Sequence, residues 1–208
     1  FLDELPEFSR TALEVLRQPL EEGSITISRA AGSVSYPSSF MLVCAMNPCR
    51  CGWYGHPSNR CRCSMGEVRA YRNRISGPLL DRIDIFLDVQ SLEFDELRSE
   101  VQAETSESIR ARVNKARQSQ RKRYKKDKIE CNAHMNIKLI GRHCRLDSQC
   151  EEIMKAAFER LGLTARSHDK ILRVSRTIAD LEGSGNIEVK HLAEALQYRS
   201  FDPRMENY

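Results

Sequence analysis

The sequence predicts an α/β segment followed by an all-helical module, and three observations support this fold class. A continuous apolar run at residues 40–46 is typical of a strand buried on both faces. A second apolar run occupies residues 83–89 and predicts another strand. Apolar residues then recur at helical spacing over residues 153–161, 171–181 and 189–196, with glycines between the first two segments and after the second. Short loops between helices favour a small antiparallel bundle.

Composition places the chain among globular proteins of one or two domains. It has 208 residues, of which 40% are hydrophobic and 30% are charged. No apolar run is long enough to span a membrane and no leader suggests secretion, so we expect a cytoplasmic location. A net charge of +4 is too mild to indicate nucleic-acid binding by itself. Eight cysteines in such a chain favour metal ligation or free thiols over disulfides.

The first predicted helix follows Ser9, a good N-cap residue. Pro19 should bend or end this helix, and Gly23 should stop it. Alternating apolar and polar residues at 24–28 and 33–36 then predict a β-hairpin. Arg29, beside the hairpin tip, would contact phosphate, or the hairpin is a surface element without a ligand.

Polar residues follow the predicted strands at their carboxyl ends, where parallel sheets place ligand sites. Asp3 and Glu4 follow an apolar dipeptide, and Asn47 follows residues 40–46. Two adjacent carboxylates suit phosphoryl chemistry, because one can hold Mg²⁺ while the other polarises the attacking water. Asn47 would orient that water, and Arg82 would reach the nucleotide of a neighbouring subunit. Alternatively, the acids end a surface strand and Arg82 forms a local salt bridge.

Two C-x-C pairs lie close together after Asn47. The predicted zinc ligands are Cys49, Cys51, Cys61 and Cys63. Four thiolates can surround one tetrahedral Zn²⁺ and order a loop too short for its own core. The spacing is tighter than the usual C-x₂-C, and His56 is a spare ligand. The alternative is a loop of reduced, metal-free thiols.

A short helix is predicted from Ser64 to Tyr71, and its Arg69 and Arg72 are expected to be solvated. A longer helix is predicted over residues 106–124, with a thin apolar face and a very basic opposite face. That basic face either tracks phosphate groups or belongs to a solvated linker helix. Its candidate DNA-binding residues are Arg110, Arg117 and Lys122.

The chain resembles the Mg-chelatase-like AAA+ ATPases of the ComM/YifB family. The resemblance rests on motifs that span nearly the whole chain: FLDELPEF (1–8), AMNPCRCGWYGHP (45–57), YRNRISGPLLDRIDI (71–85) and ILRVSRTIADLEG (171–183). It implies the C-terminal part of an AAA+ P-loop ATPase core, followed by a small helical bundle called the lid. The implied domains are a partial core at 1–92, a linker with the basic helix at 93–135, and the lid at 136–208.

The resemblance also implies roles for individual residues. Asp3 and Glu4 would form the Walker B site, with Asn47 as sensor 1 and Arg82 as the arginine finger. Arg166 would be the sensor 2 arginine that contacts ATP, with Arg173 and Arg176 as alternates or simply surface charges. The hairpin would project towards the pore of a ring, and the cofactors would be ATP and Mg²⁺.

The chain departs from the family pattern at its start. No G-x-x-x-x-G-K-[ST] motif occurs, so we expect an inactive fragment that begins at Walker B. The parent would be an ATP hydrolase that forms a hexameric ring and remodels DNA, as in branch migration during competence. One alternative is the ATPase subunit of a metal chelatase, against which the cysteine loop argues. The other is a non-enzymatic, zinc-stabilised interaction module.

Overall fold

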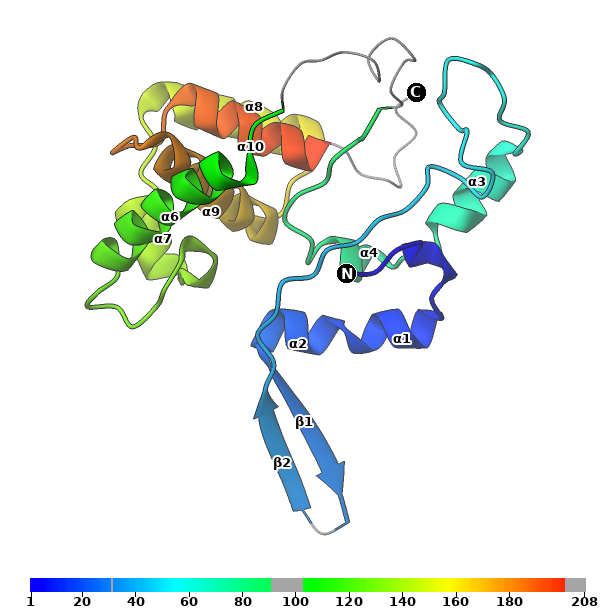
Figure 1. The fold of residues 1–208 in the computed structure, drawn as a ribbon, viewed down its shortest axis with the longest axis horizontal. Coiled ribbons are helices and arrows are strands. Elements are labelled where there is room, and N and C mark those ends of the chain that lie inside the picture. The colour runs from blue at the N-terminus through cyan, green and yellow to red at the C-terminus, as the bar shows by residue number, and fades with distance from the viewer. Residues whose placement is uncertain (31, 91–102, 201–208) are drawn as a thin grey trace. The chain divides into compact units, whose positions relative to one another are not determined.

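The computed structural model describes residues 1–30, 32–90 and 103–200, which divide into two compact units (Figure 1). The first comprises residues 1–83 and the second comprises the described residues from Asp84 onward. The described part is mostly helical and contains one two-stranded sheet.

Unit 1 combines short helices with one hairpin. Its elements are η1 (Leu5–Glu7), α1 (Arg10–Val15), α2 (Arg17–Glu22), β1 (Ser24–Arg29), β2 (Gly32–Pro37), α3 (Met65–Arg72) and α4 (Gly77–Leu80). Ser9 caps α1 by accepting a hydrogen bond from the Ala12 amide. The predicted bend falls at Leu16, between α1 and α2, because the Pro19 ring cannot continue the preceding turn. Gly23 ends α2 with a φ of 63°, as expected for a helix stop.

The predicted hairpin is confirmed as β1 and β2, which extend as a two-stranded ribbon from the end of α2 (Figure 1). Ile25 pairs with Tyr36 and Ile27 pairs with Val34, so apolar side chains share one face. All four of these side chains are exposed.

The prediction of a fully buried strand at residues 40–46 is wrong. This segment is extended but makes a single parallel bridge, between Leu2 and Cys44, and Met41 is 85% exposed. The predicted strand at 83–89 is also absent, and Val89 is 87% exposed. A parallel strand is buried only when neighbours flank it and helices cover both faces, and the described residues supply one neighbour.

Unit 2 is a helical bundle. Its elements are α6 (Ser106–Arg123), η2 (Asn132–His134), α7 (Ile137–His143), α8 (Ser148–Leu161), α9 (Ala165–Glu182) and α10 (Val189–Ser200). The last three confirm the predicted helical module. Gly162 and Gly183 end α8 and α9 in left-handed conformations. Helix α7 is an addition to the predicted elements, although its N-cap residue Asn136 is a strong signal for a helix start.

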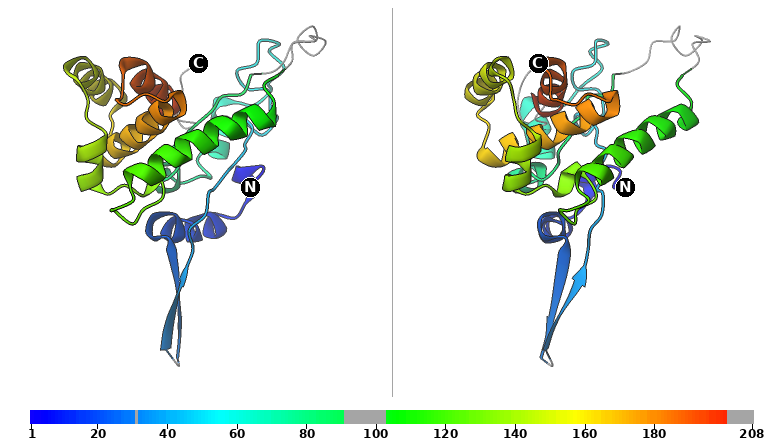
Figure 2. Two further views of the ribbon diagram at one scale, coloured as in Figure 1. Left: turned by 60° about the vertical axis from the view of Figure 1, so that its left-hand side comes forward. Right: turned by 90° about the vertical axis from the view of Figure 1, so that its left-hand side faces the viewer.

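Helices α6, α7 and α10 of unit 2 pack on α9, and α8 packs on α10 (Figure 2). Helix α6 packs on α9 through the buried side chains of Ala116 and Gln120, followed by Tyr124. Its predicted apolar face is buried only in this C-terminal half, because Ile109 and Val113 are each 41% exposed. The basic helix thus packs within unit 2, and the division into a linker at 93–135 and a lid at 136–208 stays a prediction.

A buried ionic network lies at the centre of unit 2. Asp180 accepts hydrogen bonds from Arg123, Arg176 and Asn132. Arg176 also donates to the carbonyl oxygens of Ser184 and Gly185. The expectation that Arg176 is a surface charge is wrong, since only 2% of it is exposed. One carboxylate and two carbonyl oxygens replace the water that this buried guanidinium would otherwise bind.

Candidate functional site

Asp3, Glu4 and Asn47 follow two short extended segments that run side by side in parallel. The Leu2 amide donates to the Val43 carbonyl at 2.8 Å, and the Ala45 amide donates to the Leu2 carbonyl at 2.9 Å. The Leu5 amide donates to the Ala45 carbonyl at 3.0 Å. The two segments run in parallel, so their carboxyl ends lie at the same edge. Asp3 and Glu4 follow the first segment at that edge, and residues 46–47 follow the second.

The local backbone presents both carboxylates to solvent. Asp3 and Glu4 are exposed, and the Asp3 Oδ1 atom accepts a hydrogen bond from the Glu4 amide at 2.9 Å. Glu4 has a φ of 50°, in the left-handed region, and Pro6 starts the short η1 turn directly after it. Mg²⁺ is usually held by one or two carboxylates together with phosphate oxygens and water, and the assignment of Asp3 to this ion stays a prediction.

Tyr71, on α3, is a residue of this edge that the sequence analysis did not single out. It is buried, and burial raises the pKa of its hydroxyl, with the Glu7 carboxylate adding to the rise. The backbone of Asn47 faces that hydroxyl and opposes the shift. The sequence does contain a signal for the burial of Tyr71, because Tyr71 follows Val68 by three residues and both lie on the buried face of α3.

Arg82 is held within unit 1. Its Nη1 atom donates to the Pro78 carbonyl at 2.6 Å and its Nε atom donates to the Arg17 carbonyl at 3.2 Å. Its other terminal nitrogen forms an ion pair with Glu21, which is distant in sequence. The anticipated local salt bridge thus exists, but its acid is neither of the flanking aspartates.

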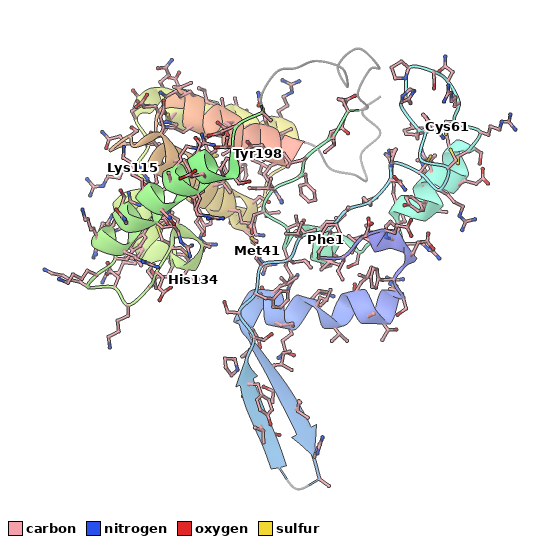
Figure 3. The ribbon with its side chains drawn as sticks, viewed as in Figure 1. Phe1, Met41, Cys61, Lys115, His134 and Tyr198 are labelled. Atoms are coloured by element: carbon pink, nitrogen blue, oxygen red, sulfur yellow. The ribbon has the colours of Figure 1, made fainter. Side chains whose placement is uncertain are left out.

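The four cysteines of the two C-x-C pairs form one cluster. Their Sγ atoms all lie within 4.8 Å of one another, and Figure 3 labels Cys61 among them. Cys49 and Cys61 are 3.8 Å apart, and Cys51 and Cys61 are 3.6 Å apart. Four thiolates at about 2.3 Å from a tetrahedral Zn²⁺ have Sγ atoms about 3.8 Å apart. The donor set therefore fits a metal ion.

The thiols also affect one another's ionisation. The backbone of Trp53 and the Cys49 thiol lower the pKa of Cys51 to about 6. The backbone of Cys51 lowers the pKa of Cys63, but the Cys51 and Cys49 thiols and burial together raise it to about 12. Crowded thiols resist full ionisation in this way, and a bound cation would remove the resistance.

The rest of the loop supports this cluster. Gly52 and Gly55 adopt φ values of 81° and 79° that permit its tight turns. His56 lies outside the cluster, because its Nδ1 atom interacts with Ser58.

Arg72 fastens the loop to α3, so the expectation that it is solvated is wrong. Its Nε atom donates to the Pro48 carbonyl at 3.1 Å, and its guanidinium lies 4.9 Å from the centre of the Tyr54 ring. These contacts leave only 6% of Arg72 exposed.

The predicted DNA-binding residues are all exposed: Arg29, Arg110, Arg117 and Lys122. The last three lie on α6, whose surface is basic over most of its length. Arg112 of α6 pairs at 2.8 Å with Glu104, which precedes the helix, and this contact neutralises one cation of the basic surface.

The arginines expected to sense ATP differ in their surroundings. Arg166 is exposed in the first turn of α9. Arg173 is partly buried and donates to the Met135 carbonyl at 2.7 Å.

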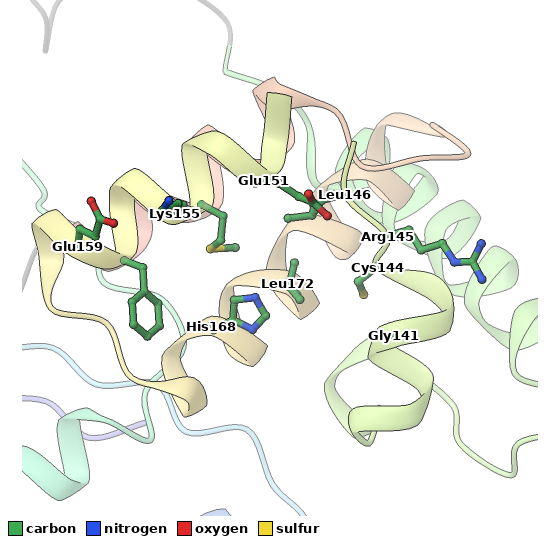
Figure 4. Close-up of a pocket in the computed structure, with 11 residues that line it drawn as sticks. Gly141, Cys144, Arg145, Leu146, Glu151, Lys155, Glu159, His168 and Leu172 are labelled. Carbon is green, nitrogen blue, oxygen red and sulfur yellow. The ribbon is translucent and has the colours of Figure 1, made fainter. Parts of the chain in front are cut away.

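Unit 2 also contains a pocket of about 510 Å³ (Figure 4). Apolar side chains including Met154, Phe158 and Leu172 form part of its lining. Glu151 and Lys155 on α8 and His168 on α9 supply polar groups.

Comparison with known proteins defines the class. Residues 1–97 match the family model described as magnesium chelatase, subunit ChlI, and residues 103–199 match the model of the ChlI C-terminal region. The chain therefore belongs to the magnesium-chelatase ChlI-like family.

The most informative relatives are ComM and YifB proteins. The chain is 45% identical to Competence protein ComM of Haemophilus influenzae over 96% of its length, and 40% identical to YifB of Escherichia coli over 97%. It is 36% identical to the Mycobacterium tuberculosis protein Rv2897c over 98% of its length. The chain spans 38%, 39% and 40% of the lengths of these three relatives, respectively.

None of the helices in the described ranges combines the length and apolar character that crossing a bilayer requires.

Proposed function

We propose that this chain is part of a ring-forming AAA+ ATPase that couples ATP hydrolysis to DNA remodelling in the cytoplasm. The observation that carries the proposal is the shared edge at which Asp3 and Glu4 leave one parallel segment and Asn47 follows the next. This arrangement supports the proposal because phosphoryl transfer needs carboxylates for Mg²⁺ and a polar group for the attacking water on one side of the nucleotide. Similarity to a competence protein favours DNA as the substrate.

Each site residue has a defined part in this proposal. Asp3 holds Mg²⁺, Glu4 polarises the attacking water and Asn47 orients it. Arg82 exchanges its contact with Glu21 for the γ-phosphate of the neighbouring subunit in a hexamer. Arg166 and Arg173, both on α9, contact the nucleotide from the lid. Arg29, Arg110, Arg117 and Lys122 contact DNA phosphates.

The cysteine cluster takes a structural role. Cys49, Cys51, Cys61 and Cys63 would hold one Zn²⁺, and four protein ligands leave no position for a reactive water. The loop follows Asn47 directly and is fastened to α3 by Arg72. Ordering it therefore stabilises the edge that carries Asn47.

The test is ATP turnover by the full-length protein. Glu4→Gln should abolish Mg²⁺-dependent hydrolysis, because the substituted amide cannot polarise water. Glu7→Gln is the matched control, since Glu7 is an exposed acid that pairs with Arg74 at 3.0 Å. Equal turnover in the Glu4→Gln variant and the wild type would refute the proposal. We expect no turnover from the 208-residue chain alone, which lacks the G-x-x-x-x-G-K-[ST] phosphate loop.

A second candidate is a zinc-stabilised interaction module without enzymatic activity. The cysteine cluster and the local pairing of Arg82 favour it. A full-length protein that binds zinc but hydrolyses no ATP in the presence or absence of DNA would support this candidate. The chelatase-subunit alternative has the description of the family models in its favour.

A further inference from the structure

A second, smaller pocket in unit 2 is lined by basic side chains. It has a volume of about 160 Å³, enough for several water molecules and hence for one tetrahedral oxyanion. Its charged and polar lining residues are Arg123, Arg142, His143, Arg145, Arg176 and Asn186. No acidic residue is found among the described residues that line it.

The nearby carboxylates leave this pocket positive. Asp180 serves both Arg123 and Arg176, and Asp127 reaches Arg142 only at 3.5 Å. Arg145 is exposed and forms no ion pair within the described ranges. Figure 4 shows Arg145 extending away from the other labelled residues of the larger pocket. Two carboxylates therefore pair with three of the four guanidinium groups, and Arg145 has no acidic partner among the described residues.

His143 lines the same pocket and carries a buried polar atom, Nε2, without a hydrogen-bond partner in the described ranges. The ring meets the Tyr124 ring edge-on, with 5.5 Å between centroids. Buried polar atoms are rarely left unpaired, so the Nε2 nitrogen is available to a hydrogen-bonding ligand.

We propose that this pocket binds one backbone phosphate of a nucleic acid. Guanidinium groups match phosphate oxygens in a bidentate geometry, and the neutral imidazole would donate one further hydrogen bond from Nε2. The basic surface next to the pocket favours a polyanion over a free phosphate ion. Exposed cations continue from the end of α6 into the next loop: Arg121, Lys122, Lys125, Lys126 and Lys128.

The lining of this pocket includes neither Arg166 nor Arg173, the two arginines proposed to contact ATP. Arg166 and Arg176 are ten residues apart on α9, which corresponds to about 15 Å along the helix axis. The inference rests on the DNA part of the proposed function and is independent of ATP hydrolysis.

The test is binding of a fluorescein-labelled single-stranded oligonucleotide, followed by anisotropy over a series of salt concentrations. Arg145→Gln should weaken binding about tenfold at low salt and reduce the slope of log affinity against log salt by about 1. Arg160→Gln is the matched control, because Arg160 is an exposed arginine in the last turn of α8 and does not line the pocket. Equal losses in the two variants would overturn the proposal.

NMR of the His143 side chain distinguishes the source of the phosphate. Burial lowers the pKa of His143, as do Arg123, Arg142 and Arg176, whereas Asp127 opposes them. A bound phosphate should raise that pKa, and the oligonucleotide should do so at lower concentration than inorganic phosphate. A response to inorganic phosphate alone would overturn the assignment to nucleic acid. A wild-type chain that binds no oligonucleotide would also overturn it, whereas ATP turnover tests the proposed function separately.

Discussion

The two units differ in how completely they cover their own apolar side chains. Unit 2 packs α6, α7 and α10 on α9 and buries there an ionic network in which Arg123 and Arg176 share Asp180. Unit 1 leaves Met41, Val43 and the apolar face of its hairpin exposed. A helix satisfies its own backbone hydrogen bonds, whereas an extended segment depends on neighbouring strands. Unit 2 should therefore be the more stable unit, and unit 1 should depend more on a metal and on surfaces outside the described residues.

Removal of metal should affect unit 1 far more than unit 2. A strong chelator should release one Zn²⁺ per chain and disorder residues 49–63, because metal binding contributes directly to the stability of such a loop. Elemental analysis and hydrogen exchange would measure this, with amides of α9 as the internal control. Substoichiometric zinc in protein purified without added metal, with eight titratable thiols, would show that the loop contains plain reduced cysteines.

Loss of the Arg82 guanidinium should test whether unit 1 completes its site on another subunit. In the full-length protein, Arg82→Ala should lower ATP turnover about 10³-fold and leave nucleotide binding nearly intact. Mixing this variant with Glu4→Gln protein should restore part of the activity through composite sites. Absence of rescue together with unfolding would instead assign Arg82 to its local contact with Glu21.

The buried network makes unit 2 sensitive to a single substitution. Asp180→Asn should destabilise it by about 3–5 kcal/mol, since two arginines would lose their shared carboxylate. Urea denaturation would measure the loss, and Asp169→Asn on the same helix is the control because Asp169 is only partly buried. An effect below about 1 kcal/mol would show that the network contributes little.

The same carboxylate predicts a pH dependence for unit 2. Burial raises the pKa of Asp180, but hydrogen bonds from Arg123 and Asn132 outweigh that effect and lower it below its usual value. A lowered folded-state pKa contributes stability at pH above about 4, and this stability is lost as the pH falls through the folded-state value. Acid titration of the α9 helical signal should show this loss, and it should be absent in Asp180→Asn.

The smallest expected effect concerns the cap of α3 in unit 1. Ser64 and Glu67 form a reciprocal capping box, with the Ser64 amide donating to Glu67 at 2.8 Å. Ser64→Ala should cost about 1 kcal/mol and loosen the adjoining cysteine loop. Hydrogen exchange of α3 amides would detect the change, whereas Ser119→Ala on the exposed side of α6 should have no effect there.

Local signals were sufficient to predict elements that depend on nearby residues. Ser9, Gly23 and Gly162 marked helix ends correctly, and the alternation at 24–36 predicted the hairpin. The spacing of the four cysteines predicted their cluster, because two short C-x-C pairs on one loop can meet without help from other elements.

Partners distant in sequence were decided only by the tertiary structure. Apolar character at 40–46 could not reveal how many strands flank that segment, since burial depends on neighbours that sequence patterns do not specify. Nor could sequence show that Arg72 and Arg176 are buried, because their partners, Pro48 and Asp180 among them, reach them only through packing. Residue types and short spacings determined the helices, the hairpin and the thiol cluster. Packing alone decided which charges are buried and which remain available for a ligand.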